Sequence, residues 1–315
     1  MLGVAPTWNG YGALVNILVA GASGFVGSHI CAALVDGGHL VRAMTRRPES
    51  YQGPGVAVGG DIEERSTLDG ALQGCEAAYY LVHSLDSADF ADRDRRGAEA
   101  FGDAASAAGL RQVIYLGGLG DEHDKLSAHL SSRREVEGIL RTRVPTTVLR
   151  AGIVIGDGGI SWEILRQLVA RLPVMVTPRW VQTRTQPVAI EDMVAFLVGV
   201  LGENEALGEV YDVGGPDPMT YGEMLKVVGR MPGGILKLIL PVPLLSPRLS
   251  SHWLRLVTDV DLRTARALID SMSNEVVVHD RRIEELTGHR AMAFEEAAER
   301  ALRERSYRLD PLAAV

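Results

Sequence analysis

A short β-branched run followed by three regularly spaced glycines constrains the fold of this chain more than any other feature. Residues 15–20 are typical of a buried strand, Gly21, Gly24 and Gly27 follow at three-residue intervals, and residues 28–35 form an amphipathic segment typical of a helix. The first glycine permits a tight turn, the second lets backbone N–H groups approach a pyrophosphate, and the third lets helix and strand pack closely. The positive end of the helix then faces the anion. The pattern therefore predicts a dinucleotide site, rather than a glycine turn that only connects two elements.

Strands alternate with helices along most of the chain, which is typical of an α/β fold with a parallel doubly wound sheet. After the first strand, the expected strands are 40–45, 55–61, 77–82, 112–116, 146–150 and 208–213. The expected helices include 63–72, 92–108, 160–172, 191–201 and 221–230. We expect residues 1–14 to be a flexible arm, 15–230 a nucleotide-binding domain to which 156–187 add a substrate side, and 231–315 a mostly helical substrate lobe.

Composition argues against several classes of protein. The chain has 315 residues, 46% of them hydrophobic, which suffices for one large domain or a domain with a smaller lobe. Its net charge of −8 argues against a nucleic-acid surface, which would need a basic face. Cys31 and Cys75 lack a CxxC partner and are expected to be buried thiols. We find no metal-ligand spacing, no signal-peptide pattern and no window of the roughly 20 apolar residues that a membrane span needs, so we expect a cytoplasmic protein.

The longest apolar stretch, residues 235–245, is interrupted by Lys237, Pro241 and Pro243. Together with His252-Trp253-Leu254, this stretch is compatible with packing onto the main domain, with a cover over a hydrophobic substrate, and with a peripheral membrane contact. The sequence does not indicate an oligomeric state.

The spacing G-x-x-G-x-x-G is similar to that of extended and atypical short-chain dehydrogenase/reductases. Three later segments agree, each following an expected strand: Gly60-Asp61-Ile62, residues 80–84 (YLVHS) and residues 114–120 (IYLGGLG). From about residue 15 to 230 the chain resembles this superfamily, near its NmrA-like NAD(P)-binding branch. The resemblance implies a Rossmann fold, an NAD(P) cofactor and a small-molecule substrate. It implies that the cofactor contacts Gly21, Ala22, Ser23, Gly24, Phe25, Val26, Gly27, Thr45, Arg46, Arg47, Asp61, Ile62, Leu81, Val82, His83, Ser84, Gly117 and Arg133.

The end of the second expected strand favours NADP over NAD, although NAD is still possible. NAD-preferring proteins usually place an acidic residue about 20 residues past the glycines, where it accepts hydrogen bonds from the ribose. Here the sequence is Thr45-Arg46-Arg47, and two guanidinium groups suit a 2′-phosphate. A solvated basic turn is the alternative interpretation. Asp61 either flanks the adenine with Ile62, as in the relatives, or caps the next helix, and both roles are compatible.

The segment after the fifth expected strand departs from the catalytic pattern of the family. Typical members carry a serine there and then Tyr-x-x-Ser-Lys-x-x-x-Glu, in which the tyrosine is the general acid/base, the lysine holds the ribose and the serine polarises the carbonyl. Here Gly117-Gly118 take the serine position, His129 that of the tyrosine and Arg133 that of the lysine. We expect His129 to act as acid/base near neutral pH, or else to be a surface or capping group, and Arg133 to bind the ribose. Tyr115 is expected in the core.

Two functional classes agree with these motifs. The first is an NADPH-dependent oxidoreductase acting on a small apolar carbonyl, quinone or related compound, with Arg184 holding a polar substrate group or lying in a surface turn. The second is a catalytically weak, NADP(H)-sensing regulatory protein of NmrA type, suggested by the loss of serine, tyrosine and lysine together. An isomerase or dehydratase with a tightly held cofactor is a third possibility.

Overall fold

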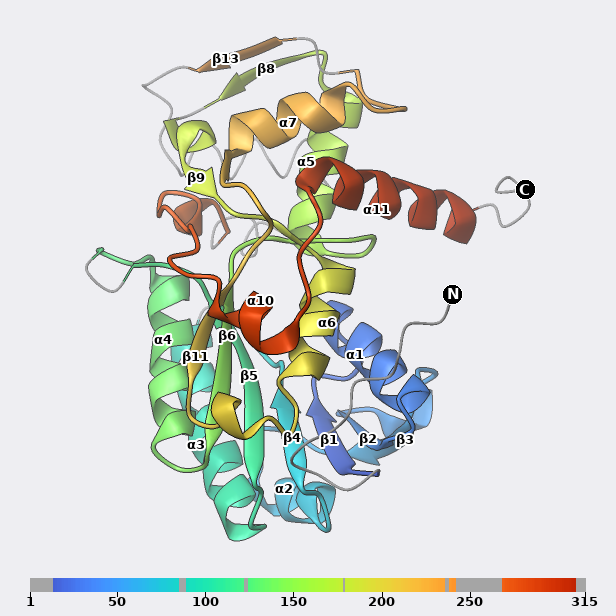
Figure 1. Ribbon diagram of the computed structural model, residues 1–315, viewed down its shortest axis with the longest axis vertical. Helices are drawn as coiled ribbons and strands as arrows, with labels where there is room; N and C mark the ends of the chain where they lie inside the picture. The colour runs from blue at the N-terminus through green and yellow to red at the C-terminus, as the bar shows by residue number, and fades with distance from the viewer. Residues whose placement is uncertain are drawn as a thin grey trace.

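Seven parallel strands form the centre of the computed structural model, which describes residues 14–84, 89–121, 124–177, 179–235, 238–241 and 268–309 (Figure 1). Their order is β11-β6-β5-β4-β1-β2-β3, so the chain winds outward from β1 in one direction and from β4 in the other. This is the doubly wound sheet that the alternation of elements predicts. The strands are β1 (Asn16–Ala20), β2 (Leu40–Thr45), β3 (Val56–Gly59), β4 (Ala77–Tyr80), β5 (Gln112–Gly118), β6 (Thr146–Ala151) and β11 (Val210–Val213).

Helices cover both faces of this sheet. Strand β1 shows why, because its successive side chains enter two different cores: Ile17 and Val19 point to one face, and Leu18 and Ala20 to the other. The first face is covered by α1 (Phe25–Asp36), α6 (Ile190–Gly199) and α10 (Arg282–Thr287). The second is covered by α2 (Arg65–Leu72), α3 (Phe90–Ala107) and α4 (Ala128–Arg141).

A third core lies beyond the carboxyl ends of the strands, in the upper part of Figure 1. It is built around the fully buried Trp162 by α5 (Ile160–Arg171), α7 (Tyr221–Gly229) and α11 (Phe294–Leu309). Three small strand pairs accompany it: β8 (Val174–Thr177) with β13 (Leu238–Pro241), β7 (Val154–Ile155) with β10 (Val188–Ala189), and β9 (Arg184–Thr185) with β12 (Met219–Thr220). Short 3-10 turns occur at η1 (Pro48–Ser50), η2 (Arg179–Gln182) and η3 (Asn204–Ala206).

The expected elements agree with the structure in kind and order, and two differences are informative. Helix α1 begins at Phe25, three residues earlier than expected, because Gly24 has an extended backbone (φ −78°, ψ 171°) and forms the N-cap. Strand β13 interrupts a region that was expected to be mostly helical. Residues 1–13, 242–245 and 252–254 lie outside the described residues, and the proposed domain boundaries stay a prediction. Within the described ranges, no helix is long and apolar enough to cross a membrane.

Candidate active site

The glycine turn brings β1 and α1 so close together that side chains are excluded. Gly21 has a φ of +91°, which favours glycine, and a Cβ on Gly27 would lie 2.0 Å from the Gly21 carbonyl oxygen. Gly24 has no side chain to cap α1, and the first turn of α1 contains no acidic residue. The first N–H groups of α1 are therefore left for an anionic ligand, and these residues fit the pyrophosphate of a dinucleotide.

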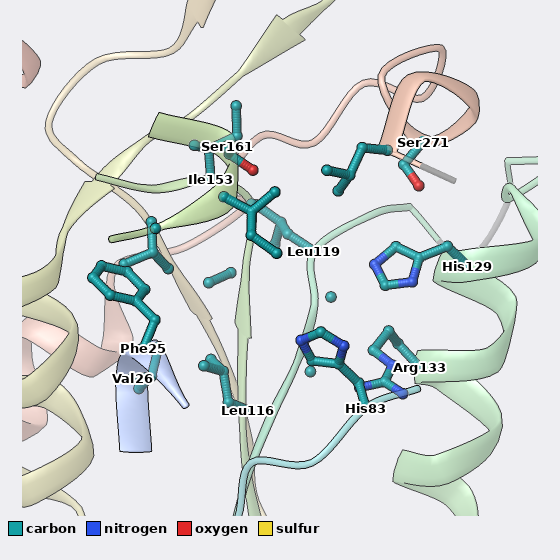
Figure 2. A pocket seen from close by; sticks show the side chains of 18 of the residues that line it. Phe25, Val26, His83, Leu116, Leu119, His129, Arg133, Ile153, Ser161 and Ser271 are labelled. Carbon is teal, nitrogen blue, oxygen red and sulfur yellow. The ribbon is translucent and has the colours of Figure 1, made fainter. Parts of the chain in front are cut away.

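A cavity of about 310 Å³ extends from the glycine turn toward the third core (Figure 2). Its wall includes the ends of β4 and β5, the first turns of α4 and α5, and part of the segment 268–276. Most lining side chains are apolar, for example Leu119, Ile153 and Met272. The polar side chains that reach it are His83, His129, Arg133, Ser161, Tyr221 and Ser271. An apolar cavity with a few convergent polar groups is typical of a small-molecule site.

His129 lies in the first turn of α4, two residues after the N-cap Ser127, whose side chain accepts a hydrogen bond from Leu130 N (3.2 Å). Its Nδ1 is buried and has no hydrogen-bond partner among the described residues. Burial, then the charge of Arg133 and then His83 lower the pKa of His129 from 6.5 to about 3. Burial and the neighbouring charge argue against titration of this ring near neutral pH, and its catalytic role stays a prediction. His129 is a neutral imidazole with one N–H to donate.

Arg133 forms a buried ion pair with Asp94, a residue that the sequence analysis did not select. The two side chains are 6% and 2% exposed. Arg133 also donates to the Val82 carbonyl oxygen (3.5 Å), and its Nε is buried without a partner in the described part of the chain. Some of the Arg133 N–H groups that we expect to bind the ribose therefore donate to Asp94 and Val82 instead.

Asp94 also joins two segments of the site. Its carboxylate accepts hydrogen bonds from Ser84 N (3.0 Å), after β4, and from Ser132 Oγ (3.1 Å), in α4. A signal for Asp94 was present in the sequence, because it is one turn before the buried Gly97 and Ala98 and two turns before Phe101. It therefore belongs to the inward-facing stripe of α3, where an acidic side chain needs a partner.

The two glycines at the usual serine position allow α4 to pack closely against the end of β5. A Cβ on Gly118 would lie 2.8 Å from Leu130 Cδ2 and 3.4 Å from Arg133 Cγ. Tyr115, two residues before Gly117 on the same strand, is buried as expected. Its hydroxyl donates a hydrogen bond to the carbonyl oxygen of Arg133 (3.1 Å). At Gly118 the space of a side chain is thus taken by Leu130 and Arg133 of α4, whereas a Cβ on Gly117 would lie 3.1 Å from the Tyr115 ring.

Comparison with known proteins places this geometry in a family. A family model described as NAD(P)H-binding matches residues 21–170. A reductase of (4-alkanoyl-5-oxo-2,5-dihydrofuran-3-yl)methyl phosphate from Streptomyces griseus is 31% identical over 70% of this chain and 75% of the relative. A ceramide reductase from Caulobacter vibrioides is 30% identical over 82% of this chain and 78% of the relative. The chain belongs to the family of these two reductases, and its fold is that of the short-chain dehydrogenase/reductases. It is thus a member of an NAD(P)-binding oxidoreductase family.

Solved structures of this superfamily share the fold at low sequence identity. A short-chain dehydrogenase/reductase superfamily protein from Agrobacterium tumefaciens with bound NAD is 21% identical, with a TM-score of 0.66 over 95% of this chain and 100% of the other. An NADPH-dependent quinone oxidoreductase from Escherichia coli, complexed with NADPH, is 20% identical, with a TM-score of 0.72 over 90% and 98%.

The residues predicted to hold the adenosine half of the cofactor lie at or just after the ends of β2 and β3. Thr45 Oγ1 accepts from Arg47 N (3.2 Å), and both Arg46 and Arg47 are exposed. Asp61 Oδ1 accepts from Glu63 N (3.0 Å), so it caps a turn, and α2 begins only at Arg65. The side chain of Ile62 is buried in the core beneath α3, where a Cβ on Gly97 would lie 2.7 Å from its Cδ1.

The other predicted residues divide between the cavity wall and its surroundings. Those that line the cavity are Gly21, Gly24, Phe25, Val26, Gly27, Leu81, His83, Gly117, His129 and Arg133. Ala22 and Ser84 are buried, Ser23 is exposed, and Val82 Cγ2 would lie 3.3 Å from a Cβ on Gly21. Arg184 is exposed, pairs with Glu275 (3.5 Å) and is not part of the lining, so a substrate contact by Arg184 stays a prediction.

The glycine turn provides a matched pair of substitutions. Gly24→Val is expected to abolish NADPH binding in calorimetry, because the valine side chain would lie where the pyrophosphate approaches the turn. The far-UV circular dichroism spectrum should be almost unchanged, because Gly24 is exposed at the mouth of the turn. Gly27→Val should instead unfold the protein or strongly lower its melting temperature, since its Cβ would collide with the Gly21 carbonyl oxygen. Unfolding of both variants would mean that Gly24 serves packing alone.

Proposed function

We propose that this protein is an NADPH-dependent reductase of apolar carbonyl compounds, such as ketones, quinones or related compounds. The observation that carries the proposal is the continuity of one mostly apolar cavity from the glycine turn to the side chains of His129 and Arg133. Two relatives named as reductases, one acting on an alkanoyl-substituted ring and one on ceramide, support an acyl or alkyl chain as the apolar part of the substrate.

The residues around the cavity suggest how this chain assists the reduction. NADPH supplies a hydride from its nicotinamide when it is bound. The neutral His129 ring, which is largely buried, donates its N–H to the substrate oxygen on which negative charge develops. The guanidinium of Arg133 is close to the His129 ring. Its positive charge stabilises the negative charge that develops on the substrate oxygen. The apolar wall orients the substrate.

Preference for NADPH is supported by the free arginines after β2. Within the described residues, neither the Arg46 nor the Arg47 guanidinium has an ion pair or a side-chain hydrogen bond.

The double variant Arg46→Ala/Arg47→Ala is expected to weaken NADPH binding by roughly 1–3 kcal/mol, because charge-assisted bonds to the 2′-phosphate are lost. Binding of NADH, which lacks this phosphate, should change little. Calorimetry with both cofactors measures the difference, and Arg300→Ala, an exposed charge on α11, serves as the control. Equal losses for NADPH and NADH would contradict NADPH selectivity.

The function is tested by following NADPH absorbance with menadione, decanal and ethyl β-ketodecanoate. We expect steady turnover of at least one of the three by the wild-type protein and none by Gly24→Val, which controls for contaminating reductases. If NADPH binds in calorimetry but none of these compounds, nor any in a wider carbonyl panel, is reduced, the proposal fails and the sensor interpretation replaces it.

A further inference from the structure

Two histidines of unlike environment face the same cavity. Figure 2 shows the rings of His83 and His129 on one side of the cavity, with the Arg133 side chain beside them. The rings are close enough for His83 to influence the protonation of His129 electrostatically. His83 is exposed, whereas Nδ1 of His129 is shielded from water. The two imidazoles thus differ in their access to solvent protons.

Asp94 holds the two histidine-bearing segments in a fixed relation. One carboxylate oxygen accepts from the backbone N–H of Ser84, the residue after His83. The other accepts from Ser132 and Arg133, in the turn of α4 that follows His129. Because Asp94 is 1% exposed, these bonds are shielded from water and resist exchange. Asp94 therefore links the segment that follows β4, which carries His83, to the helix that carries His129.

We infer that His83 is the proton donor of the reduction, while His129 only binds the carbonyl oxygen. The inference rests on the proposed function. In the step, bound NADPH would supply the hydride that forms the new C–H bond, and the C=O π electrons would move to the oxygen. The proton of a His83 N–H then forms the O–H bond, which leaves an alcohol, NADP⁺ and a neutral His83 ring. Water returns the proton to the exposed His83 side chain after each turnover.

Exchanging the two roles would be unfavourable. A proton lost from His129 would have to be replaced inside a buried site beside the positive charge of Arg133. Among the described residues, the titratable and charged side chains that line the cavity with His83 are His129 and Arg133 from α4, and Asp94 from α3 binds the backbone N–H of the next residue, Ser84. Since the protonated form of His83 is the active one, kcat should fall as the pH rises.

The kinetic test compares His83→Gln with wild type on ethyl β-ketodecanoate. Because glutamine donates a hydrogen bond but no proton, kcat should fall about 100-fold, the loss of kcat at high pH should disappear, and KM for NADPH should stay nearly constant. Imidazole added to the buffer should restore activity to His83→Ala, whose site opens to solvent, but not to His129→Ala. An unchanged kcat and pH profile in His83→Gln, with an active wild type, would overturn only the assignment of His83. An inactive wild type would overturn the proposed function, and this inference with it.

A second measurement does not depend on activity. Nuclear magnetic resonance of protein with nitrogen-labelled histidine, assigned with His83→Gln and His129→Phe, reports the protonation of each ring without substrate. The proposal requires that His83 takes up a proton between about pH 8 and 5, where histidines ordinarily titrate, and that His129 stays neutral throughout. A His83 ring that remains neutral over this range, or a His129 ring that titrates in it, would overturn the assignment.

Discussion

Replacing Asp94 with alanine is expected to lower the free energy of unfolding by roughly 3–5 kcal/mol, because Arg133 would keep a buried charge without its partner. Ser84 N and Ser132 Oγ would lose their acceptors in the same change, and both residues are buried. Urea denaturation followed by circular dichroism measures this loss.

Asp92 provides a matched control for Asp94. It lies on the same helix, its side chain is 65% exposed and it pairs with Arg95 (3.0 Å), so Asp92→Ala should cost less than about 1 kcal/mol. Asp94→Asn should fall between the two, because an amide oxygen still accepts from Ser84 N but does not neutralise Arg133. If Asp94→Ala costs no more than Asp92→Ala, the carboxylate does not hold the site together.

Replacing His129 with phenylalanine is expected to lower kcat by about 10²-fold on a carbonyl compound that the wild type reduces, since a donor to the developing oxyanion typically supplies that much. The affinity for NADPH should be unchanged, because phenylalanine keeps the ring volume and the glycine turn is not altered. Steady-state kinetics and calorimetry together measure the two effects.

His129→Gln distinguishes the two possible roles of this ring. A glutamine N–H still donates a hydrogen bond, so it should recover much of the activity if His129 acts as a neutral donor. It should be as poor as phenylalanine if His129 transfers a proton. Normal turnover by His129→Phe would remove His129 from the mechanism altogether.

The lowered pKa of His129 also predicts a pH dependence of stability. The unfolded chain takes up this proton near pH 6.5 and the folded chain only near pH 3. Between these values the unfolded state binds more protons, so this group costs the folded protein stability as the pH falls from 6.5 to 3. His129→Phe should lose less stability than wild type over that window.

Local sequence determined the nucleotide-binding half of this protein. A buried strand, three glycines and a helix are contiguous in the chain, and their geometry follows from steric limits on adjacent residues. The alternation of strands and helices likewise predicts the parallel sheet, because each crossover is short and has one favoured hand. The family motif also selected Gly117, His129 and Arg133, which line one cavity in the structure, and the roles expected for them stay predictions.

Only the tertiary structure decided the chemistry of the cavity. Asp94 and Arg133 are 39 residues apart in sequence, and no local pattern states that they pair. The protonation of His129 depends on burial and on charges that α4, β4 and β5 bring around it, whereas its sequence neighbours suggest an ordinary histidine. His83 was already expected at the cofactor, but that it shares a cavity with His129 depends on the exit of β4 facing the start of α4. Desolvation and long-range contacts set these properties, and both exist only once the chain has folded.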